Sequence, residues 1–235
     1  MKSIVAVLLL LSGAARAADP DILWKIVHDK CVPAADGKPC AEVSRDGGFA
    51  VLKDLNGIAQ HLLIPTAKVT GIEDAAVLAP QTPNYFADAW NARHYVEARL
   101  GHPLPREAVS LAINSETGRS QNQLHIHIDC VRADVRAVLQ GLTADHWASV
   151  PMPGGHSYRV RRIAADDLAS TNPFRLLASE QPDSVADFGH HTIVLVGAEF
   201  AGQNGFYMLD DHADMMTLDP GSGEELQDHS CGLPK

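Results

Sequence analysis

Apolar-rich segments of strand length, bounded by turn residues, recur along the chain and predict β-strands. Seven segments show this pattern: 49–55, 60–65, 108–114, 123–131, 158–163, 192–196 and 205–209. The first two flank Asn56-Gly57, a dipeptide typical of hairpin turns. The third and fourth flank a polar loop at 115–122, so we expect them to pair as well.

Four further segments have apolar residues at helical spacing, at 20–30, 84–100, 133–141 and 165–178, and a short helix is expected near the C-terminus. The segment 84–100 predicts the longest helix, which ends at Gly101. We therefore predict an α+β fold with an antiparallel sheet and helices on one side of it. The stretch 151–155 (PMPGG) predicts a boundary between a core, 18–150, and a smaller α+β lobe packed on it, 151–235.

The first 17 residues have the pattern of an export signal. Lys2 is followed by the apolar stretch 4–11 and by Ala15-Arg16-Ala17, an A-x-A cleavage site. The apolar stretch is shorter than the roughly 20 residues that span a bilayer. We predict cleavage after Ala17, and a retained short anchor is the alternative.

The charge balance excludes one class of partner. Without residues 1–17 the chain has 17 basic and 29 acidic residues, a net charge of −12. Nucleic-acid affinity comes largely from basic contacts with phosphates, so the sequence argues against a nucleic-acid partner. A phosphate site would have to be a local basic or N–H-lined pocket.

The even number of cysteines in an exported chain predicts two disulfides. Four cysteines allow three pairings, and the sequence alone does not decide among them. We prefer Cys31–Cys40 as a local link and Cys130–Cys231 as a tether for the C-terminus. A zinc site is the competing hypothesis, although no C-x-x-C pair is present.

The segment 123–130 carries the most informative polar residues. Alternate strand residues face opposite ways, so Leu124, Ile126 and Ile128 are expected in the core. His125 and His127 then lie side by side on an open polar face, with Cβ atoms roughly 7 Å apart.

Such a pair allows three interpretations. One imidazole can attack phosphorus while the other donates a hydrogen bond to a phosphate oxygen. Both can bind a metal ion, or both can be solvated strand residues. The preceding loop favours the first, because Gly118 permits a tight turn with free N–H groups, Arg119 adds charge and Ser120 adds a hydroxyl. An ordinary hairpin loop would use the same glycine and serine.

The stretch His125-Ile126-His127-Ile128 resembles the signature strand of the histidine-triad superfamily, in which histidines alternate with apolar residues. The segments 51–54 and 60–69 resemble the strand, acidic residue and hairpin of the same superfamily. Nearly the whole chain after residue 17 is similar to one branch, the CDP-diacylglycerol pyrophosphatases. This similarity is carried by the stretches KIVHDKC, PCAEV, VLKDLNG, AVSLAINSETGR, HIHIDCVRADVR, PMPGG and QDHSC.

The resemblance implies that CDP-diacylglycerol and water give CMP and phosphatidate through a nucleotidyl-histidine, with no cofactor or metal. It implies that His125 is the nucleophile and that His127 contacts the reacting phosphate. Gln123 stands where the triad has its first histidine. The other implied substrate contacts are Asp54 at the ribose hydroxyls and Asn114 and Ser120 along the phosphates.

Other polar residues have weaker claims. Lys68 can approach the phosphates or lie on the surface. The basic run 158–162 can meet an anionic head group or membrane surface, or form a solvated strand face. His190, His191 and residues 210–212 are candidate metal ligands, although the two adjacent histidines are not expected to share an ion. His156 and His229 are candidate contributors to the site. His61 is given no role.

Together these features predict an exported, periplasmic hydrolase at the outer face of the inner membrane. The first alternative is an enzyme of the same chemistry that hydrolyses soluble nucleotides or acts as a nucleotidyl transferase. The second is an exported metal- or nucleotide-binding protein without catalysis. With an unperturbed pKa of about 6.5, the nucleophile His125 would lose activity as the pH drops through that value.

Overall fold

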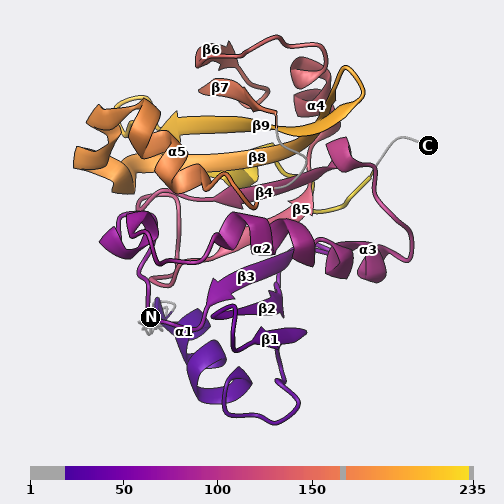
Figure 1. Cartoon of the computed structure of the whole chain (residues 1–235), viewed down its shortest axis with the longest axis vertical. Coiled ribbons are helices and arrows are strands. Elements are labelled where there is room, and N and C mark those ends of the chain that lie inside the picture. The colour runs from indigo at the N-terminus through magenta and orange to yellow at the C-terminus, as the bar shows by residue number, and fades with distance from the viewer. Residues whose placement is uncertain (1–18, 165–167, 233–235) are drawn as a thin grey trace, which may run out of the picture.

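The computed structural model describes residues 19–164 and 168–232, so the predicted signal segment 1–17 lies outside the description. Its centre is a nine-stranded antiparallel sheet with the order β1-β2-β3-β5-β4-β8-β9-β7-β6 (Figure 1). The strands are β1 (Glu42–Ser44), β2 (Phe49–Lys53), β3 (His61–Pro65), β4 (Val109–Ile113), β5 (Ile126–Cys130), β6 (Ala148–Pro151), β7 (Ser157–Ile163), β8 (His191–Phe200) and β9 (Gln203–His212). The predicted α+β class with an antiparallel sheet is confirmed.

Five α-helices and several shorter helical turns accompany the sheet in the described ranges. The α-helices are α1 (Ile22–Ile26), α2 (Tyr85–Ala92), α3 (His94–Leu100), α4 (Ala133–Leu139) and α5 (Pro173–Glu180). A π-helical turn, η1 (Val27–Cys31), continues α1, and the 3-10 turns are η2 (Ala75–Leu78), η3 (Arg106–Ala108), η4 (Pro182–His190) and η5 (Gly223–Leu226).

One side of the sheet, here called the core face, carries the largest apolar cluster. Ile126 and Ile128 of β5 lie in it, fully buried, beside Leu111 of β4. The helices α2 and α5 cover this face, contributing Phe86 and Phe174 (Figure 1). The prediction that the isoleucines of segment 123–130 face the core is confirmed.

The opposite side, here called the site face, is covered only near its two ends. At one end α1 packs Leu23 against Leu62 of β3. At the other end α4 packs Val135 against Leu209 of β9. The expectation of helices on one side only was wrong, because both ends of this face also bury apolar strand residues. The space between α1 and α4 is left to polar side chains of β4 and β5 and of residues next to the strands, such as Gln60 before β3 and Asn114 after β4.

The segment 84–100 forms two helices instead of one. Asn84 caps the first, since its Oδ1 accepts the N–H of Ala87, and Gly101 ends the second with a φ of 79°. Between them the chain tightens at Arg93, whose guanidinium donates to the carbonyl of Trp90 at 2.7 Å. The same carbonyl accepts the backbone N–H of Arg93 at 3.4 Å, and this tighter bond ends α2 before α3 begins.

The helix expected over 165–178 begins later, at Pro173. Asn172 starts it, because its side chain accepts the N–H of Arg175 at 3.2 Å and proline is favoured at the first helical position. Of the predicted stretch, residues 165–167 lie outside the described residues.

The sheet runs without a break from the predicted core into the predicted lobe. Strand β4 pairs with β8, and the hairpin of β6 and β7 turns at 152–156, where PMPGG lies. The later strands extend the sheet on which the earlier ones are built. The division into 18–150 and 151–235 stays a prediction.

Two disulfides join the four cysteines, Cys31–Cys40 and Cys130–Cys231, which is the pairing preferred from the sequence. The first closes a loop of nine residues beside α1. The second spans 101 residues and fixes the C-terminal end of the described chain to β5. With all four sulfurs oxidised, no thiolate is available for the zinc hypothesis.

Candidate functional site

The two histidines of the predicted pair share the site face, but that face is not open. His127 pairs with Leu62 of β3 and Ala112 of β4, and His125 lies just before β5 begins. Their exposed fractions are only 4% and 8%. The prediction of an open face was wrong, and the interpretation as solvated strand residues is contradicted too, because a distant segment covers this face.

That segment, residues 221–231, is here called the C-terminal strap. The N–H of Gly223 donates to Asn114 Oδ1 at 2.9 Å, and the N–H of Asp228 donates to the carbonyl of Cys130 at 2.8 Å. The disulfide at Cys231 then ties the strap down. The strap therefore closes one side of the polar space between α1 and α4.

His125 is held in one tautomer by the backbone. Its Nδ1 lies 2.7 Å from the carbonyl oxygen of Gln123. A carbonyl only accepts hydrogen bonds, so Nδ1 carries the proton and Nε2 keeps its lone pair. Burial lowers the pKa of His125 below its ordinary value of 6.5, although the bond to Gln123 opposes this shift. The result is a neutral imidazole with a nucleophilic nitrogen.

His127 is held in the opposite tautomer. Its Nδ1 lies 2.6 Å from Gln60 Nε2, an amide nitrogen that can only donate, so the ring proton belongs on Nε2. The same Gln60 nitrogen is 3.4 Å from a carboxylate oxygen of Glu224, which keeps the amide in this orientation. Burial is the main cause that places the pKa of His127 well below 6.5. The charges of His125 and His229, when protonated, lower it further. His127 thus presents a neutral N–H donor.

The two rings lie together in a cavity of about 340 Å³, with their centroids 4.8 Å apart. Most of the predicted substrate-binding residues line the same cavity. The lining residues are Asp54, Asn56, Leu62, Asn114, Gly118, Arg119, Ser120, Gln121, His125, His127 and Glu224. Five of the seven residues predicted around the pair are therefore brought to it by the fold.

Gly118 has a packing role that the sequence pattern did not show. A Cβ atom at this position would lie 2.3 Å from the carbonyl oxygen of Gly221 in the strap. The N–H of Gly118 donates to Ser115 Oγ at 3.0 Å, so it is not free for a phosphate as the sequence suggested. The glycine allows the loop and the strap to lie in contact.

Arg119 lines the cavity as one half of an ion pair. Its Nη1 donates to Glu73 Oε2 at 2.8 Å, its Nη2 donates to the other oxygen, and its side chain is 5% exposed. The paired carboxylate offsets the positive charge expected from the sequence. Arg119 therefore provides a fixed donor surface more than a net charge.

Two predicted residues lie outside the cavity lining. Lys68 Nζ lies 2.7 Å from Asp21 Oδ1 and 5.6 Å from the centre of the Trp24 ring, on the side of α1. Gln123 is fully buried, and its Nε2 donates to the carbonyls of Pro65 and Ala67. Gln123 thus anchors the start of β5 to the end of β3 while its own carbonyl orients His125.

Gln60 and Glu224, which contact His127, were not among the residues predicted from the sequence. Gln60 begins a predicted strand whose other residues are mostly apolar. A polar side chain at such a position is a signal that could have marked it as a site residue. Glu224 lies 97 residues beyond His127, and no spacing rule connects the two.

His229, expected as a possible contributor, does lie close to the site. Its Nδ1 is 2.8 Å from Asp129 Oδ2, and its Nε2 is 3.9 Å from Glu224 Oε2. Burial raises the pKa of Asp129, and the bond to His229 works in the opposite direction. His156, the other candidate, bonds Glu225 at 2.8 Å outside the cavity lining.

Within the described part of the chain, donors close enough to share a metal ion occur at two other places. One is Asp129 with Cys130 and Cys231, whose sulfurs are in a disulfide. The other is the exposed group Asp187, His190 and His212. His191 does not join it and instead bonds the buried Asp210 at 2.8 Å, as the opposite directions of neighbouring strand residues predict.

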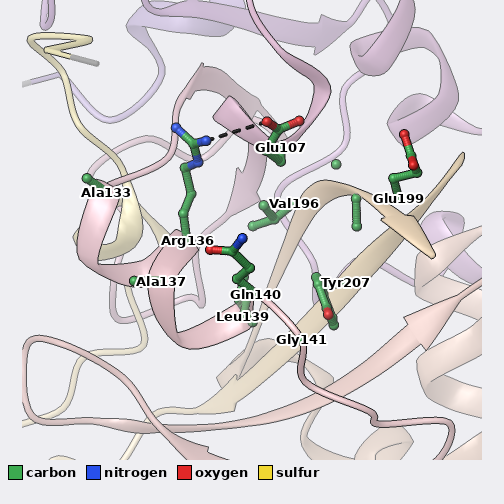
Figure 2. Close-up of a pocket in the computed structure, with 12 residues that line it drawn as sticks. Glu107, Ala133, Arg136, Ala137, Leu139, Gln140, Gly141, Val196, Glu199 and Tyr207 are labelled. Carbon is green, nitrogen blue, oxygen red and sulfur yellow. Dashed lines mark ion pairs between the residues drawn. The ribbon is translucent and has the colours of Figure 1, made fainter. Parts of the chain in front are cut away.

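A larger cavity of about 510 Å³ lies between α4 and the strands β8 and β9 (Figure 2). Its lining mixes aliphatic side chains with polar and charged ones, among them Gln140, Glu199 and Tyr207. The one arginine that lines it, Arg136, points to Glu107, and the two form an ion pair of 3.5 Å. This cavity holds no pair of imidazoles, so it is not the candidate active site.

An antiparallel sheet that presents two neutral imidazoles of opposite tautomer into a polar cavity defines a site suited to nucleophilic chemistry. The family model described as CDP-diacylglycerol pyrophosphatase matches residues 18–235. A protein of Yersinia pestis named CDP-diacylglycerol pyrophosphatase is 44% identical over 226 residues, which cover 92% of this chain and 86% of that protein. The chain therefore belongs to the CDP-diacylglycerol pyrophosphatase family.

Proposed function

We propose that the protein hydrolyses CDP-diacylglycerol to CMP and phosphatidate through a nucleotidyl-histidine intermediate on His125. Family membership supports the substrate. The opposite tautomers of His125 and His127 support the mechanism, because one ring offers a lone pair and its neighbour offers an N–H. A nucleophile beside a donor for the developing charge is the arrangement that phosphoanhydride cleavage needs.

In the first step, His125 Nε2 attacks the phosphorus next to cytidine, and phosphatidate departs with the electrons of the broken P–O bond. The ring keeps the proton on Nδ1, so the phosphorylated ring is a cation hydrogen-bonded to Gln123. The N–H of His127 and the amide of Asn114 face the cavity where the phosphorus oxygens would lie. Water then cleaves the P–N bond and releases CMP. No step uses a metal ion, so activity should persist in chelator.

The cavity suits the polar part of this substrate, and the acyl chains would remain in the membrane. Two groups of exposed apolar side chains lie on loops that lead to residues in contact with the cavity lining. Leu55 and Ile58 are 101% and 55% exposed on the loop that carries Asp54 and Asn56. The second group is Met215, Met216 and Leu218, exposed by 62%, 96% and 81%.

This second loop is closed by hydrogen bonds between Asp214 and Asp219, and it ends where Pro220 meets Thr117 and Ser115. Apolar side chains on tightly closed loops beside a lipid-hydrolysing site fit the surface of a bilayer. We therefore infer that the protein works at a membrane surface with these two loops facing the lipid. No helix among residues 19–164 and 168–232 is long and apolar enough to cross a bilayer.

Export to the periplasm, at the outer face of the inner membrane, remains part of this proposal. Two disulfides support an oxidising compartment. The export signal itself lies outside the described residues. Secretion of a fusion of residues 1–17 to a reporter enzyme would test it, with residues 18–34 as the control fusion.

The decisive experiment uses residues 18–235, oxidised, with CDP-diacylglycerol in detergent micelles and chelator present. Wild type should release CMP, and His125→Ala should lose at least about 10³-fold in kcat. His61→Ala is the matched control, because His61 is also buried but lies outside the cavity. Release by the His125 variant at the wild-type rate would remove His125 as nucleophile. If wild type releases no CMP, soluble nucleotides should be tested as substrates next. If these are not cleaved either, the protein should be tested for metal or nucleotide binding without catalysis.

A further inference from the structure

We propose that Glu224 is the general base that activates the water for hydrolysis of the nucleotidyl-histidine. The proposal rests on the covalent mechanism proposed above and adds a residue to its second step. Glu224 lies on the C-terminal strap, in the turn η5, and its side chain lines the cavity beside both histidines. It is a quarter exposed, so water can reach its carboxylate.

The carboxylate of Glu224 is surrounded by the donors that the mechanism assigns to phosphate. Asn114 Nδ2 donates to its Oε1 at 2.8 Å, and His127 Nε2 lies 3.3 Å from the same oxygen. Its other oxygen lies 3.4 Å from Gln60 Nε2. The Glu224 carboxylate therefore lies beside the same donors that would face a phosphate oxygen in the cavity.

The strap places this side chain with little freedom. A Cβ atom on the preceding residue, Gly223, would lie 2.7 Å from a methyl group of Val194 and 3.1 Å from the Cβ of Ala112, so the backbone rests directly on the sheet. Asn114 bridges the turn, accepting from the N–H of Gly223 while donating to Glu224. Such close support is what a group with a defined direction of action requires.

An anionic side chain in a pocket for an anionic substrate disfavours binding, so packing alone does not explain it. Glu224 and Asp54 both favour the positive form of the His125 ring by their charge. That form arises when Nε2 is bonded to phosphorus and Nδ1 keeps its proton. The carboxylate therefore matches the charge of the intermediate better than that of the free enzyme.

The chemical step balances with Glu224 as the base. The oxygen of water forms a bond to phosphorus, and its proton passes to the Glu224 carboxylate. The P–Nε2 bond breaks, and its electrons return His125 to the neutral imidazole with the proton on Nδ1. CMP leaves, and Glu224 then loses its proton to solvent. No proton has to reach the leaving nitrogen, which agrees with the hydrogen bond from Nδ1 to Gln123.

The neighbouring Glu225 offers a matched control. It belongs to the same turn, but its carboxylate faces Tyr158 and His156, with contacts of 2.7 and 2.8 Å. Glu225→Gln is the same chemical change one residue away, outside the cavity lining. It reports whether any effect of Glu224→Gln comes from a disturbed strap.

The test follows phosphatidate and CMP separately after rapid mixing with CDP-diacylglycerol, with intact-protein mass spectrometry after an alkaline quench. In Glu224→Gln we expect a burst of one phosphatidate per enzyme, an accumulated CMP adduct, and CMP release slowed by about 10²–10⁴-fold. Wild type and Glu225→Gln should release both products together. Formate should restore part of the CMP release in Glu224→Ala.

Other outcomes separate the two proposals. An adduct in wild type with unchanged CMP release in Glu224→Gln would overturn the role of Glu224 and leave the covalent mechanism standing. Faster turnover or a lower KM in Glu224→Gln would show that the carboxylate only blocks the phosphate site. Slowed turnover without a burst or adduct would place Glu224 in the first step and overturn the proposal. Activity of His125→Ala equal to wild type would overturn the covalent mechanism itself.

Discussion

The two faces of β5 are both buried, yet they are buried in different ways. On the core face, Ile126 and Ile128 are covered by α2 and other apolar side chains. On the site face, His125 and His127 are covered by polar groups that include Gln60 before β3, Asn114 after β4 and Glu224 of a strap that arrives almost 100 residues later. One face contributes stability through apolar burial, and the other holds chemical groups in fixed protonation states.

The difference is visible in the hydrogen bonds. Within the described ranges, buried polar atoms without a well-placed partner include Gln60 Oε1, Gln123 Oε1, His127 Nε2 and Arg119 Nε. Unsatisfied buried atoms destabilise a fold and are usually few. Arg119 and His127 line the cavity and Gln60 contacts His127, so a ligand bound in the cavity can supply partners for this face, which the core face does not need.

Of the changes that test this difference between the two faces, removal of the disulfide Cys130–Cys231 should have the largest effect. Replacing Cys130 and Cys231 together by alanine frees a loop of 101 residues, which corresponds to about 4–5 kcal/mol in the chain-entropy model. Because the strap covers only the site face, activity at a temperature where the variant remains folded should fall as well. Chemical denaturation and kcat would measure the two effects.

The Cys31 and Cys40 double alanine variant is the control for loss of a disulfide. Its loop of nine residues lies beside α1, away from the strap, so the loss of stability should be smaller and kcat should change little. Equal losses of kcat in both variants would contradict a specific role for the strap.

A substitution on the core face alone should lower stability by a smaller amount and leave activity nearly unchanged. Ile128→Ala should lower the free energy of unfolding by about 2–5 kcal/mol, since a large buried side chain is lost. The kcat per folded molecule should stay within about twofold of wild type, because the side chain points away from the cavity. A large fall in kcat with unchanged stability would show that the two faces are not separable.

The tautomer of His127 gives a sharper test of the site face. Gln60→Leu removes the donor to Nδ1 and lets the proton leave Nε2, so we expect a loss of about tenfold in kcat, below the full range of about 10²–10⁴ for a proton donor. Gln140→Leu, in the larger cavity, is the matched control. An unchanged kcat in Gln60→Leu would mean that the Gln60 bond does not set the function of His127.

The smallest effect is a displacement of the pH profile. His125 must be neutral to attack, and burial lowers its pKa below 6.5. The rate should therefore stay level as the pH drops to 6.5 and fall only at lower pH, instead of falling around 6.5 as an exposed histidine would. Measuring kcat/KM from pH 8 to 5 would show this, and a midpoint at or above 6.5 would contradict burial as the controlling factor.

Much of the fold could be predicted from local pattern. Segments 49–55 and 60–65 form the predicted hairpin, and Gly101 ends the predicted helix, because a turn or cap depends on neighbouring residues. Predictions failed where the structure depends on contacts that a local pattern does not show. The helix over 84–100 is divided at Arg93, whose backbone N–H and guanidinium both donate to the carbonyl of Trp90. Helices occupy both faces of the sheet because both bury apolar strand residues.

The candidate site, too, was predicted correctly where it depends on local pattern and incompletely where it depends on distant segments. The alternation of segment 123–130 placed His125 and His127 on one face, and the preceding loop brought in Gly118, Arg119 and Ser120. The sequence pattern could not show that Arg119 is paired with Glu73, or that Lys68 lies with Asp21 on the side of α1. Charged side chains choose partners through space, and sequence distance says little about which partner lies nearest.

By itself, the sequence determined the strand that carries the two histidines, the residues that share each of its faces, and the family, since these depend on order along the chain. Only the tertiary structure decided that the polar face is closed by the strap, that Gln60 and Glu224 meet His127, and that both rings are neutral with opposite tautomers. The physical reason is that burial and hydrogen-bond partners set a protonation state, and both come from segments far apart in the chain.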